Sequence, residues 1–150
     1  MEIKPNIWIP MCIERGSVYH FHIDKVNDDG SLYSGDRFFI ILNLDPKNDK
    51  TLITVTITKE VDKQRKFAVY TGEDPKTIVP ISKKDFPRLS RDSVVNCNRI
   101  YPTNLRELIE KIENGGKIFS DKLPKIIVNN LVSGVLNSKR VLPEHKAYLA

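Results

Sequence analysis

The first hundred residues carry apolar and polar side chains in patterns typical of β-strands. In residues 16–23, Val18, His20 and His22 alternate with Tyr19, Phe21 and Ile23, which is the period of a half-buried strand. Residues 38–42 form a continuous apolar run, which is typical of a strand buried on both faces. Residues 51–58 are almost entirely β-branched and predict a third strand. Polar stretches from Asp24 to Gly35 and from Asn43 to Lys50 predict loops between these strands.

Weaker strand patterns follow. The charged segment 59–66 predicts a hairpin tip or loop, and short strands are expected at 67–70 and 77–79. Residues 93–100 predict the last strand, whose alternation sorts its side chains onto two faces. One face carries Val94, Asn96, Asn98 and Ile100, and the other carries Ser93, Val95, Cys97 and Arg99.

The last third of the chain changes to a helical period. Asn104 and Glu107 have the spacing of a capping box, and Gly115-Gly116 ends the predicted helix. Its apolar face carries Leu105, Leu108, Ile109 and Ile112. A second helix is predicted from Ser120, with Pro124 in its first turn. Its apolar face carries Leu123, Ile127, Leu131, Val135 and Leu136.

These elements predict one domain over residues 1–150, because the sequence has no internal repeat and no linker. The fold class is mainly β (α+β), a small β-barrel of roughly five to seven short strands closed by C-terminal helices. The helical part spans about residues 103–138, and we expect residues 139–150 to form a disordered tail.

Composition narrows the class of protein. The chain is 40% hydrophobic and 29% charged, which excludes collagen-like, low-complexity and largely disordered proteins. The formal net charge of +5 suits a nucleic-acid or acidic partner, although many basic domains bind neither. Cys12 and Cys97 form no CxxC pair, which argues against a zinc cage or a disulfide framework. We expect a reduced, cytoplasmic protein with no membrane segment and no signal peptide.

Motifs read from the residues alone leave the chemistry open. No nucleotide-binding, serine-hydrolase or metal-ligand pattern occurs, so we expect no cofactor and no metal. His20 and His22 share a strand face and are either acid–base groups or ligands, or half-exposed strand histidines. Asp45 and the pair Asp28-Asp29 are interpreted as turn-stabilising residues rather than cation ligands. The charged segment 59–91 is either a solvated hairpin or a nucleic-acid surface.

Several short motifs occur in an order that resembles the PemK/MazF toxin family. Residues 16–19 (Gly-Ser-Val-Tyr) and then Gly35-Asp36-Arg37 are similar to the family's Gly-Asp-Ile/Val-Tyr/Trp and Gly-x-x-Arg-Pro strands. Asn43 and the strand 51–58 resemble its asparagine, spacer and strand that ends in a hydroxyl residue.

The later motifs extend this resemblance. Residues 92–95 (Asp-Ser-Val-Val) followed by Ile100 resemble its Asp-Ser-x-Val strand and Gln-Ile-Arg-Thr corner. Residues 116–138 follow its Gly-x-Leu-Ser and closing-helix pattern. The resemblance covers about residues 16–140, with an apparent insertion near 59–72.

The resemblance implies an SH3-like barrel that cuts single-stranded RNA at a short sequence without a metal. In that reaction the 2′-hydroxyl attacks the adjacent phosphate and leaves a 2′,3′-cyclic phosphate. Arg37 matches the family's catalytic arginine, whose guanidinium can bind two phosphate oxygens. Thr58 matches the hydroxyl residue that donates to the same phosphate. The resemblance also implies a homodimer and a cognate antitoxin whose acidic tail lies in the RNA groove.

The RNA-binding residues are expected in the same groove, and some depart from the family. Tyr33 is available for stacking on bases. Asn96 and Asn98 stand where some relatives carry a proton-transferring arginine and aspartate, and an amide cannot transfer protons near neutral pH. Arg99 is a candidate for the displaced positive charge, while Phe38 replaces the family's proline.

Two other functions remain open at the level of sequence. A barrel that binds RNA or a protein partner without cutting would explain the loss of the usual catalytic corner. A gyrase-directed toxin of the related barrel superfamily depends on apolar and aromatic residues at the end of a C-terminal helix, for which only Tyr148-Leu149 offers a match.

Overall fold

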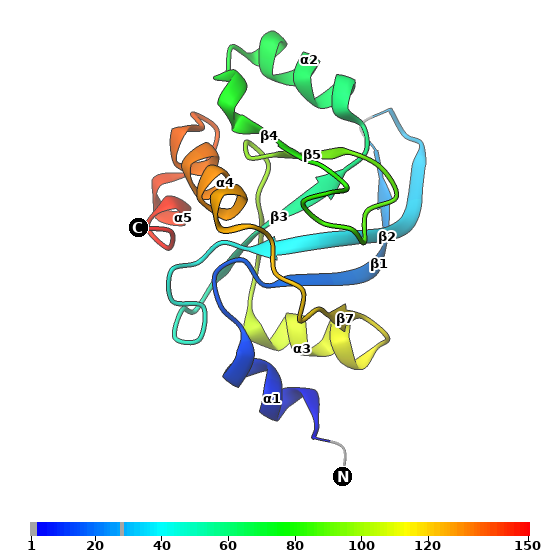
Figure 1. Cartoon of the computed structure of the whole chain (residues 1–150), viewed down its shortest axis with the longest axis vertical. Coiled ribbons are helices and arrows are strands. Elements are labelled where there is room, and N and C mark those ends of the chain that lie inside the picture. The colour runs from blue at the N-terminus through cyan, green and yellow to red at the C-terminus, as the bar shows by residue number, and fades with distance from the viewer. Residues whose placement is uncertain (1–2, 28) are drawn as a thin grey trace.

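The computed structural model describes residues 3–27 and 29–150, an α+β arrangement of an antiparallel sheet and surrounding helices (Figure 1). The strands are β1 (Val18–Val26), β2 (Leu32–Ile41), β3 (Leu52–Thr58), β4 (Ile78–Ile81), β5 (Ser93–Asn96), β6 (Tyr101–Thr103) and β7 (Lys117–Ile118). The helices are α1 (Pro5–Cys12), α2 (Val61–Thr71), α3 (Leu105–Glu113), α4 (Lys125–Asn137) and α5 (Pro143–Lys146), with a 3₁₀ turn at Pro75–Thr77.

The sheet runs in the order β4-β5-β3-β2-β1-β7, and β6 also pairs with β3. The pairings β1–β2, β2–β3, β3–β5, β3–β6, β4–β5 and β1–β7 are antiparallel. Within the described residues, β4 and β7 are the two ends of this path and do not pair with each other, so the seven-stranded sheet is not closed. The expected α+β class is confirmed at this level.

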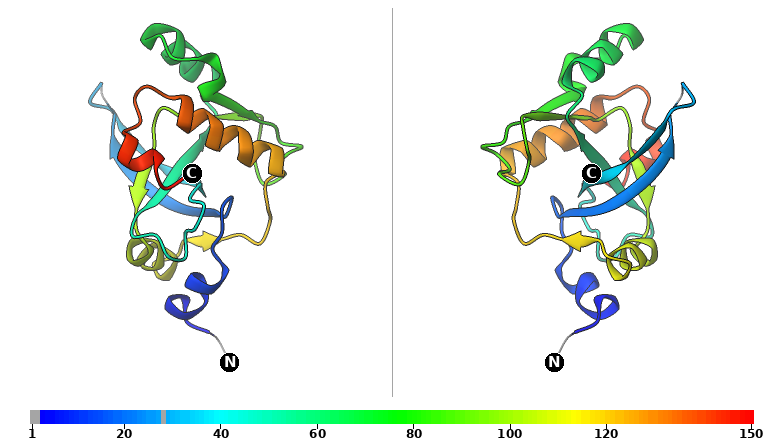
Figure 2. Two further views of the ribbon diagram at one scale, coloured as in Figure 1. Left: turned by 90° about the vertical axis from the view of Figure 1, so that its left-hand side faces the viewer. Right: turned by 90° about the vertical axis from the view of Figure 1, so that its right-hand side faces the viewer.

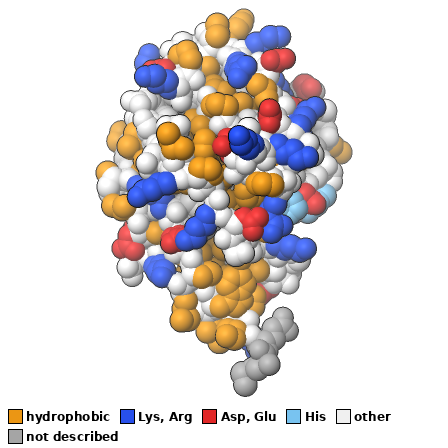
Figure 3. Space-filling model, viewed as in Figure 1, with side chains coloured by type: hydrophobic (Ala, Val, Ile, Leu, Met, Phe, Trp, Pro, Cys, Tyr) orange, Lys and Arg blue, Asp and Glu red, His pale blue; other side chains and the backbone are white. Residues whose placement is uncertain are grey.

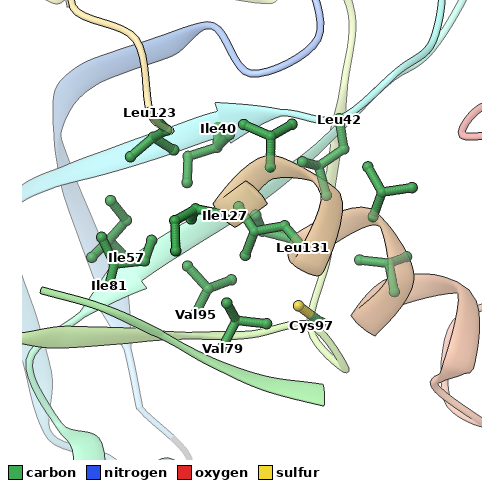
Figure 4. Close-up of a cluster of buried hydrophobic side chains, with 14 of the residues drawn as sticks. Ile40, Leu42, Ile57, Val79, Ile81, Val95, Cys97, Leu123, Ile127 and Leu131 are labelled. Atoms are coloured by element: carbon green, nitrogen blue, oxygen red, sulfur yellow. The ribbon is translucent and has the colours of Figure 1, made fainter. Parts of the chain in front are cut away.

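The continuous apolar run of β2 is buried on both faces, as the sequence predicts. Ile40 and Leu42 point to one side, where α4 supplies Ile127 and Leu131 (Figure 4). On the other side Phe39 stacks on Tyr19 and Phe21 of β1, at ring-centroid distances of 5.4 and 4.7 Å. Helices α1 and α3 cover this second cluster with Ile9, Ile13 and Leu108. The sheet therefore lies between two apolar layers.

Asn43 holds the turn between β2 and β3. Its side-chain oxygen accepts a hydrogen bond from the Ile53 amide at 2.6 Å. Its side-chain nitrogen donates to the Asp49 carboxylate at 2.9 Å and to the Thr51 carbonyl at 2.7 Å. Because Asn43 is fully buried, losing any of these bonds would leave a polar atom unsatisfied in the interior.

The helical predictions are confirmed for α3 and shift slightly for α4. The Asn104 side chain accepts from the Glu107 amide at 2.9 Å, which is the predicted cap. Helix α4 begins at Lys125 rather than at Ser120, because Pro124 has the extended backbone of an N-cap residue, with ψ 138°. The chain before it is extended, and Leu123 reaches the core.

Two predicted loops are wrong. The segment expected as a loop from Asp24 to Gly35 is mostly strand, since β1 continues to Val26 and β2 starts at Leu32. Cross-strand polar pairs such as His22–Asp36, joined at 3.1 Å, support this exposed part of the hairpin.

The segment 59–70, expected as a loop and a short strand, instead contains helix α2. Val61, Gln64 and Ala68 recur with helical spacing and face the sheet, where Ala68 packs on Ile78 and Val94. Gly72 ends the helix in the left-handed conformation, at φ 69°. The segment is therefore a folded element.

The expected disordered tail is also wrong. Residues 139–150 contain α5, and Leu149 is buried in the main core. The Leu44 amide donates to the Tyr148 carbonyl at 3.0 Å, and the Arg15 guanidinium donates to the Leu149 carbonyl. In the part of the chain that the structure describes, no helix is long and apolar enough to cross a membrane.

A substitution at Gly134 tests how closely α4 packs on the sheet. A Cβ at this position would lie 2.7 Å from the Cys97 sulfur and 3.0 Å from its Cβ. We expect Gly134→Ala to lower the free energy of unfolding by about 1–3 kcal/mol in urea titrations, because the core must shift to admit a methyl group. The exposed neighbour Ser133→Ala should change it by less than about 0.5 kcal/mol. Equal stability of the two variants would contradict this packing.

Candidate functional site

The candidate site lies where strands β2 and β3 separate. Their pairing ends at Phe39 and Thr56, and β3 then pairs with β5 through Ile57 and Thr58. Continuing the β2–β3 register by two residues would bring Thr58 opposite Arg37. Because that pair is not formed, the strands part between these two side chains.

A hollow of about 370 Å³, named here the Arg37 pocket, opens on this gap. The tip of the β1–β2 hairpin and the start of α2 form its walls, and both lie toward the same end of the molecule (Figure 2). It is lined by Val26, Asn27, Asp29, Tyr33, Arg37, Thr56, Thr58, Glu60, Lys63, Gln64, Asn96, Arg99 and Tyr101. It brings together five of the six predicted site residues: Tyr33, Arg37, Thr58, Asn96 and Arg99.

Arg37 is held over the ring of Tyr33, with its guanidinium carbon 4.4 Å from the ring centroid. The two residues lie four apart on β2 and share a face of the strand. Between them, Gly35 leaves the space that the tyrosine occupies, since a Cβ there would be 2.9 Å from the Tyr33 hydroxyl. Within residues 3–27 and 29–150, no Asp or Glu forms an ion pair with Arg37. The cation is positioned without being neutralised by a carboxylate.

Thr58 differs from the other threonines of β3. Thr54 and Thr56 donate their hydroxyl hydrogens to the carbonyls of Tyr101 and Phe38, at 2.7 and 2.9 Å. The Thr58 oxygen instead accepts from the Glu60 amide at 3.3 Å. Its own hydrogen can therefore be donated to a ligand in the pocket.

Asn96 and Asn98 belong to a buried hydrogen-bond network. The Asn96 side chain donates to Gln64 at 2.9 Å and accepts from the Asn98 amide at 3.0 Å. The Asn98 side chain donates to the Thr77 hydroxyl at 2.8 Å and accepts from Ser138 at 2.6 Å. Asn96 borders the Arg37 pocket, whereas Asn98 is not among the residues that line it. The network joins β5 to α2 and to the end of α4.

Arg99 lies at the rim of the pocket and stacks on α2. Its guanidinium carbon is 4.7 Å from the centroid of the Phe67 ring, and Arg140 approaches the same ring at 5.3 Å. The sequence analysis does not predict Glu60, Lys63 and Gln64 as lining residues of the Arg37 pocket, because it does not predict helix α2. The spacing of Val61, Gln64 and Ala68 was the available signal.

A second hollow of about 410 Å³, named here the His20 cleft, adjoins the first. The two share Tyr33, Arg37, Thr58 and Glu60. The cleft adds His20, Asp36, Phe38, Ile57, Lys59, Arg88, Leu89, Ser90 and Ser93. Arg37 and Thr58 are thus accessible from both sides of the gap between β2 and β3.

The two histidines of β1 differ in environment. Burial against aromatic rings lowers the pKa of His20 below the usual value for a histidine. The pKa of His22 is raised, chiefly by its hydrogen bond to Asp36. Nε2 of His22 also lies 3.2 Å from Asp24. In the described part of the chain, no group of three or more His, Cys, Asp or Glu side chains could hold a metal ion.

Two of the acidic residues that the sequence predicts to stabilise turns, Asp29 and Asp45, accept hydrogen bonds within their turns. Asp29 accepts from the amide of Ser31 at 2.9 Å, and Asp45 accepts from the Asn48 side chain at 3.0 Å. Asp28 lies outside the described residues.

On the face shown in Figure 3, basic and acidic side chains are interspersed, and apolar ones gather near α1, where Ile7 and Met11 are exposed. The net charge is thus not concentrated in one patch on that face.

Comparison of the sequence with protein-family models and with curated proteins finds no match. The resemblance to the PemK/MazF family therefore rests on the order of the short motifs described above.

Asn98 provides a test of the buried network. We expect Asn98→Ala to lower the free energy of unfolding by about 1–3 kcal/mol, because it removes partners from Thr77 and Ser138 in the interior. The exposed Asn129→Ala on α4 serves as the control and should cost less than about 0.5 kcal/mol. Chemical denaturation followed by circular dichroism measures both. An Asn98 variant as stable as the control would show that these bonds do not hold the fold.

Proposed function

We propose that the protein is an endoribonuclease of the toxin–antitoxin type that cuts single-stranded RNA without a metal ion. The observation that carries the proposal is the meeting of Arg37 and Thr58 at one open gap in the sheet. These two residues come from different strands, and the motif resemblance singles out the same pair. An arginine and a hydroxyl that line one open hollow form a site suited to a phosphate.

The proposed reaction is attack of the 2′-hydroxyl on the adjacent phosphorus. The Arg37 guanidinium binds the two non-bridging oxygens and stabilises the charge that develops on them. Thr58 donates a hydrogen bond to the same group. The bond to the 5′-oxygen then breaks, leaving a 2′,3′-cyclic phosphate and a 5′-hydroxyl.

Selectivity for sequence would arise in the Arg37 pocket. Its volume of about 370 Å³ falls within the range of small-ligand sites and suits one unstacked base. Tyr33 offers an aromatic edge, and Asn96 and Arg99 contribute polar groups at the wall. Lys63 of α2 adds a positively charged side chain to the lining of the same pocket, where it would attract a phosphate of the RNA backbone.

The same proposal includes the finer fold and the partners. We propose an SH3-like barrel, a homodimer, and a cognate antitoxin whose acidic segment occupies the basic groove. An RNA substrate would be met in the cytoplasm. The two-sided burial of β2 and the small antiparallel sheet support the proposed barrel family.

A second candidate function is binding of RNA or of a protein without cleavage. The observation that favours it is the engagement of Asn96 and Asn98 in structural hydrogen bonds. Amides cannot transfer protons, so the position that serves catalysis in some PemK/MazF proteins is here part of the scaffold. Salt-sensitive RNA binding with no product would support this function.

Cleavage of RNA in EDTA tests the proposal. The wild-type protein should convert end-labelled single-stranded RNA of mixed sequence to products that end in a 2′,3′-cyclic phosphate. Arg37→Ala should slow cleavage by about 100-fold or more, because it removes the cation from the developing charge. Thr58→Val should slow it by about 10- to 100-fold, the cost of one hydrogen bond to a charged group.

The control for these variants is Arg106→Ala, an exposed arginine on α3 that lines neither the Arg37 pocket nor the His20 cleft. It should leave the rate unchanged. Absence of cleavage by the wild type would contradict the nuclease, and cleavage that survives Arg37→Ala would contradict the mechanism.

A further inference from the structure

The His20 cleft contains acid–base groups that the proposed reaction lacks. The 2′-hydroxyl must lose a proton and the leaving 5′-oxygen must gain one. Asn96 and Asn98 can do neither. The residues that line the cleft together with Arg37 and Thr58 include one imidazole, His20, and the carboxylate of Glu60, which also lines the Arg37 pocket.

These groups come from the strands on either side of β2. His20 is on β1, Arg37 is on β2, and Glu60 follows the end of β3, in a sheet where β2 lies between β1 and β3. An in-line displacement needs its proton acceptor and its proton donor on opposite sides of the phosphorus. His20 shares a face of the sheet with its cross-strand partner Phe38, whereas Arg37 points to the other face, so His20 would approach a phosphate in the gap from the face opposite to Arg37.

The imidazole of His20 is held by aromatic rings. Its centroid is 4.6 Å from that of Phe38, its cross-strand partner, and 6.1 Å from that of Phe119. The side chain is half-buried and still borders the cleft. Packing on two sides fixes the ring without removing it from solvent.

Glu60 is tied to the residue that binds the phosphate. Its amide donates to the Thr58 hydroxyl oxygen at 3.3 Å, which fixes the backbone beside the gap. Its carboxylate is 3.6 Å from the Lys63 ammonium, and both side chains are mostly exposed. Such a pair is weak in water, so the carboxylate can exchange the lysine for a substrate hydroxyl.

We propose that Glu60 and His20 are the general base and the general acid of the RNA cleavage, with Arg37 between them. The inference rests on the proposed function. The Glu60 carboxylate takes the proton of the 2′-hydroxyl, and that oxygen forms its bond to phosphorus. The bond from phosphorus to the 5′-oxygen breaks, and this oxygen takes the proton of the His20 imidazolium. Water then returns the proton from Glu60 to His20.

The charged groups around His20 determine how its activity depends on pH. Asp36 faces it from β2, Lys117 from β7, and Lys59 and Arg88 line the cleft, with Glu60 across it. Burial dominates and lowers the pKa of His20, Asp36 opposes this shift, and Lys117 reinforces it. The acid form is therefore lost as the pH rises through a value below the usual 6.5, and cleavage should decline above that pH.

Glutamine variants of both residues test the pair in the full-length protein. On end-labelled single-stranded RNA in EDTA, His20→Gln and Glu60→Gln should each slow cleavage by about 100-fold or more. His20→Gln should also remove the alkaline decline of the pH profile. The controls are His145→Gln on α5 and Glu113→Gln on α3, which lie outside both hollows and should cleave like the wild type.

A substrate with sulfur in place of the bridging 5′-oxygen separates the two roles. A thiolate leaves without protonation, because thiols ionise with a pKa near about 8.5. His20→Gln should therefore cleave this substrate at nearly the wild-type rate, whereas Glu60→Gln should remain slow.

The outcomes separate the inference from the function on which it rests. Wild-type cleavage that is unchanged in both glutamine variants would overturn the pair and leave the nuclease intact. Slow cleavage of the sulfur substrate by His20→Gln would overturn the acid role of His20. No cleavage by the wild type, in the presence of salt-sensitive RNA binding, would overturn the nuclease and with it the pair.

Discussion

The end of the β2–β3 pairing at Phe39 and Thr56 is the constraint on which the site depends. Up to Thr56 the strand pairs with β2, and from Ile57 it pairs with β5. β5 lies on the other side of β3 from β2, so within the described residues the edge of β3 that faces β2 forms no strand pair beyond Thr56. Arg37 and Thr58 are the side chains at the gap, and the pocket and the cleft open on its two sides.

The layers around the sheet hold the strands that border this gap. β2 is buried by α4 on one face and by the aromatic stack with α1 and α3 on the other. Close packing on both faces fixes the position of β2 beside the gap. The Asn96–Asn98 network fixes β5 against α2 and α4 and so holds the other wall.

The sequence predicts elements whose signal is local and misses those that depend on packing. The β-branched run 51–58 and the cap at Asn104 determine their structures alone. Helix α2 was not recognised because its buried face is small and includes the polar Gln64, so it depends on contact with the sheet. The polar β1–β2 hairpin was assigned to a loop because cross-strand pairs are not visible along one strand.

The residues of the candidate site likewise divide into those that a local sequence pattern predicts and those that depend on three-dimensional packing. Arg37 and Thr58 stand out by motif order, whereas Asn98 was assigned to RNA although its hydrogen bonds to Thr77 and Ser138 appear only in three dimensions. The sequence does not single out Glu60, which lies in the charged segment before α2.

The most direct test of the phosphate site is an NMR titration with single-stranded RNA that is 2′-O-methylated and cannot be cut. Amide shifts should be largest at residues 33–37 and 56–60. Shifts centred on α1, or none, would contradict the account.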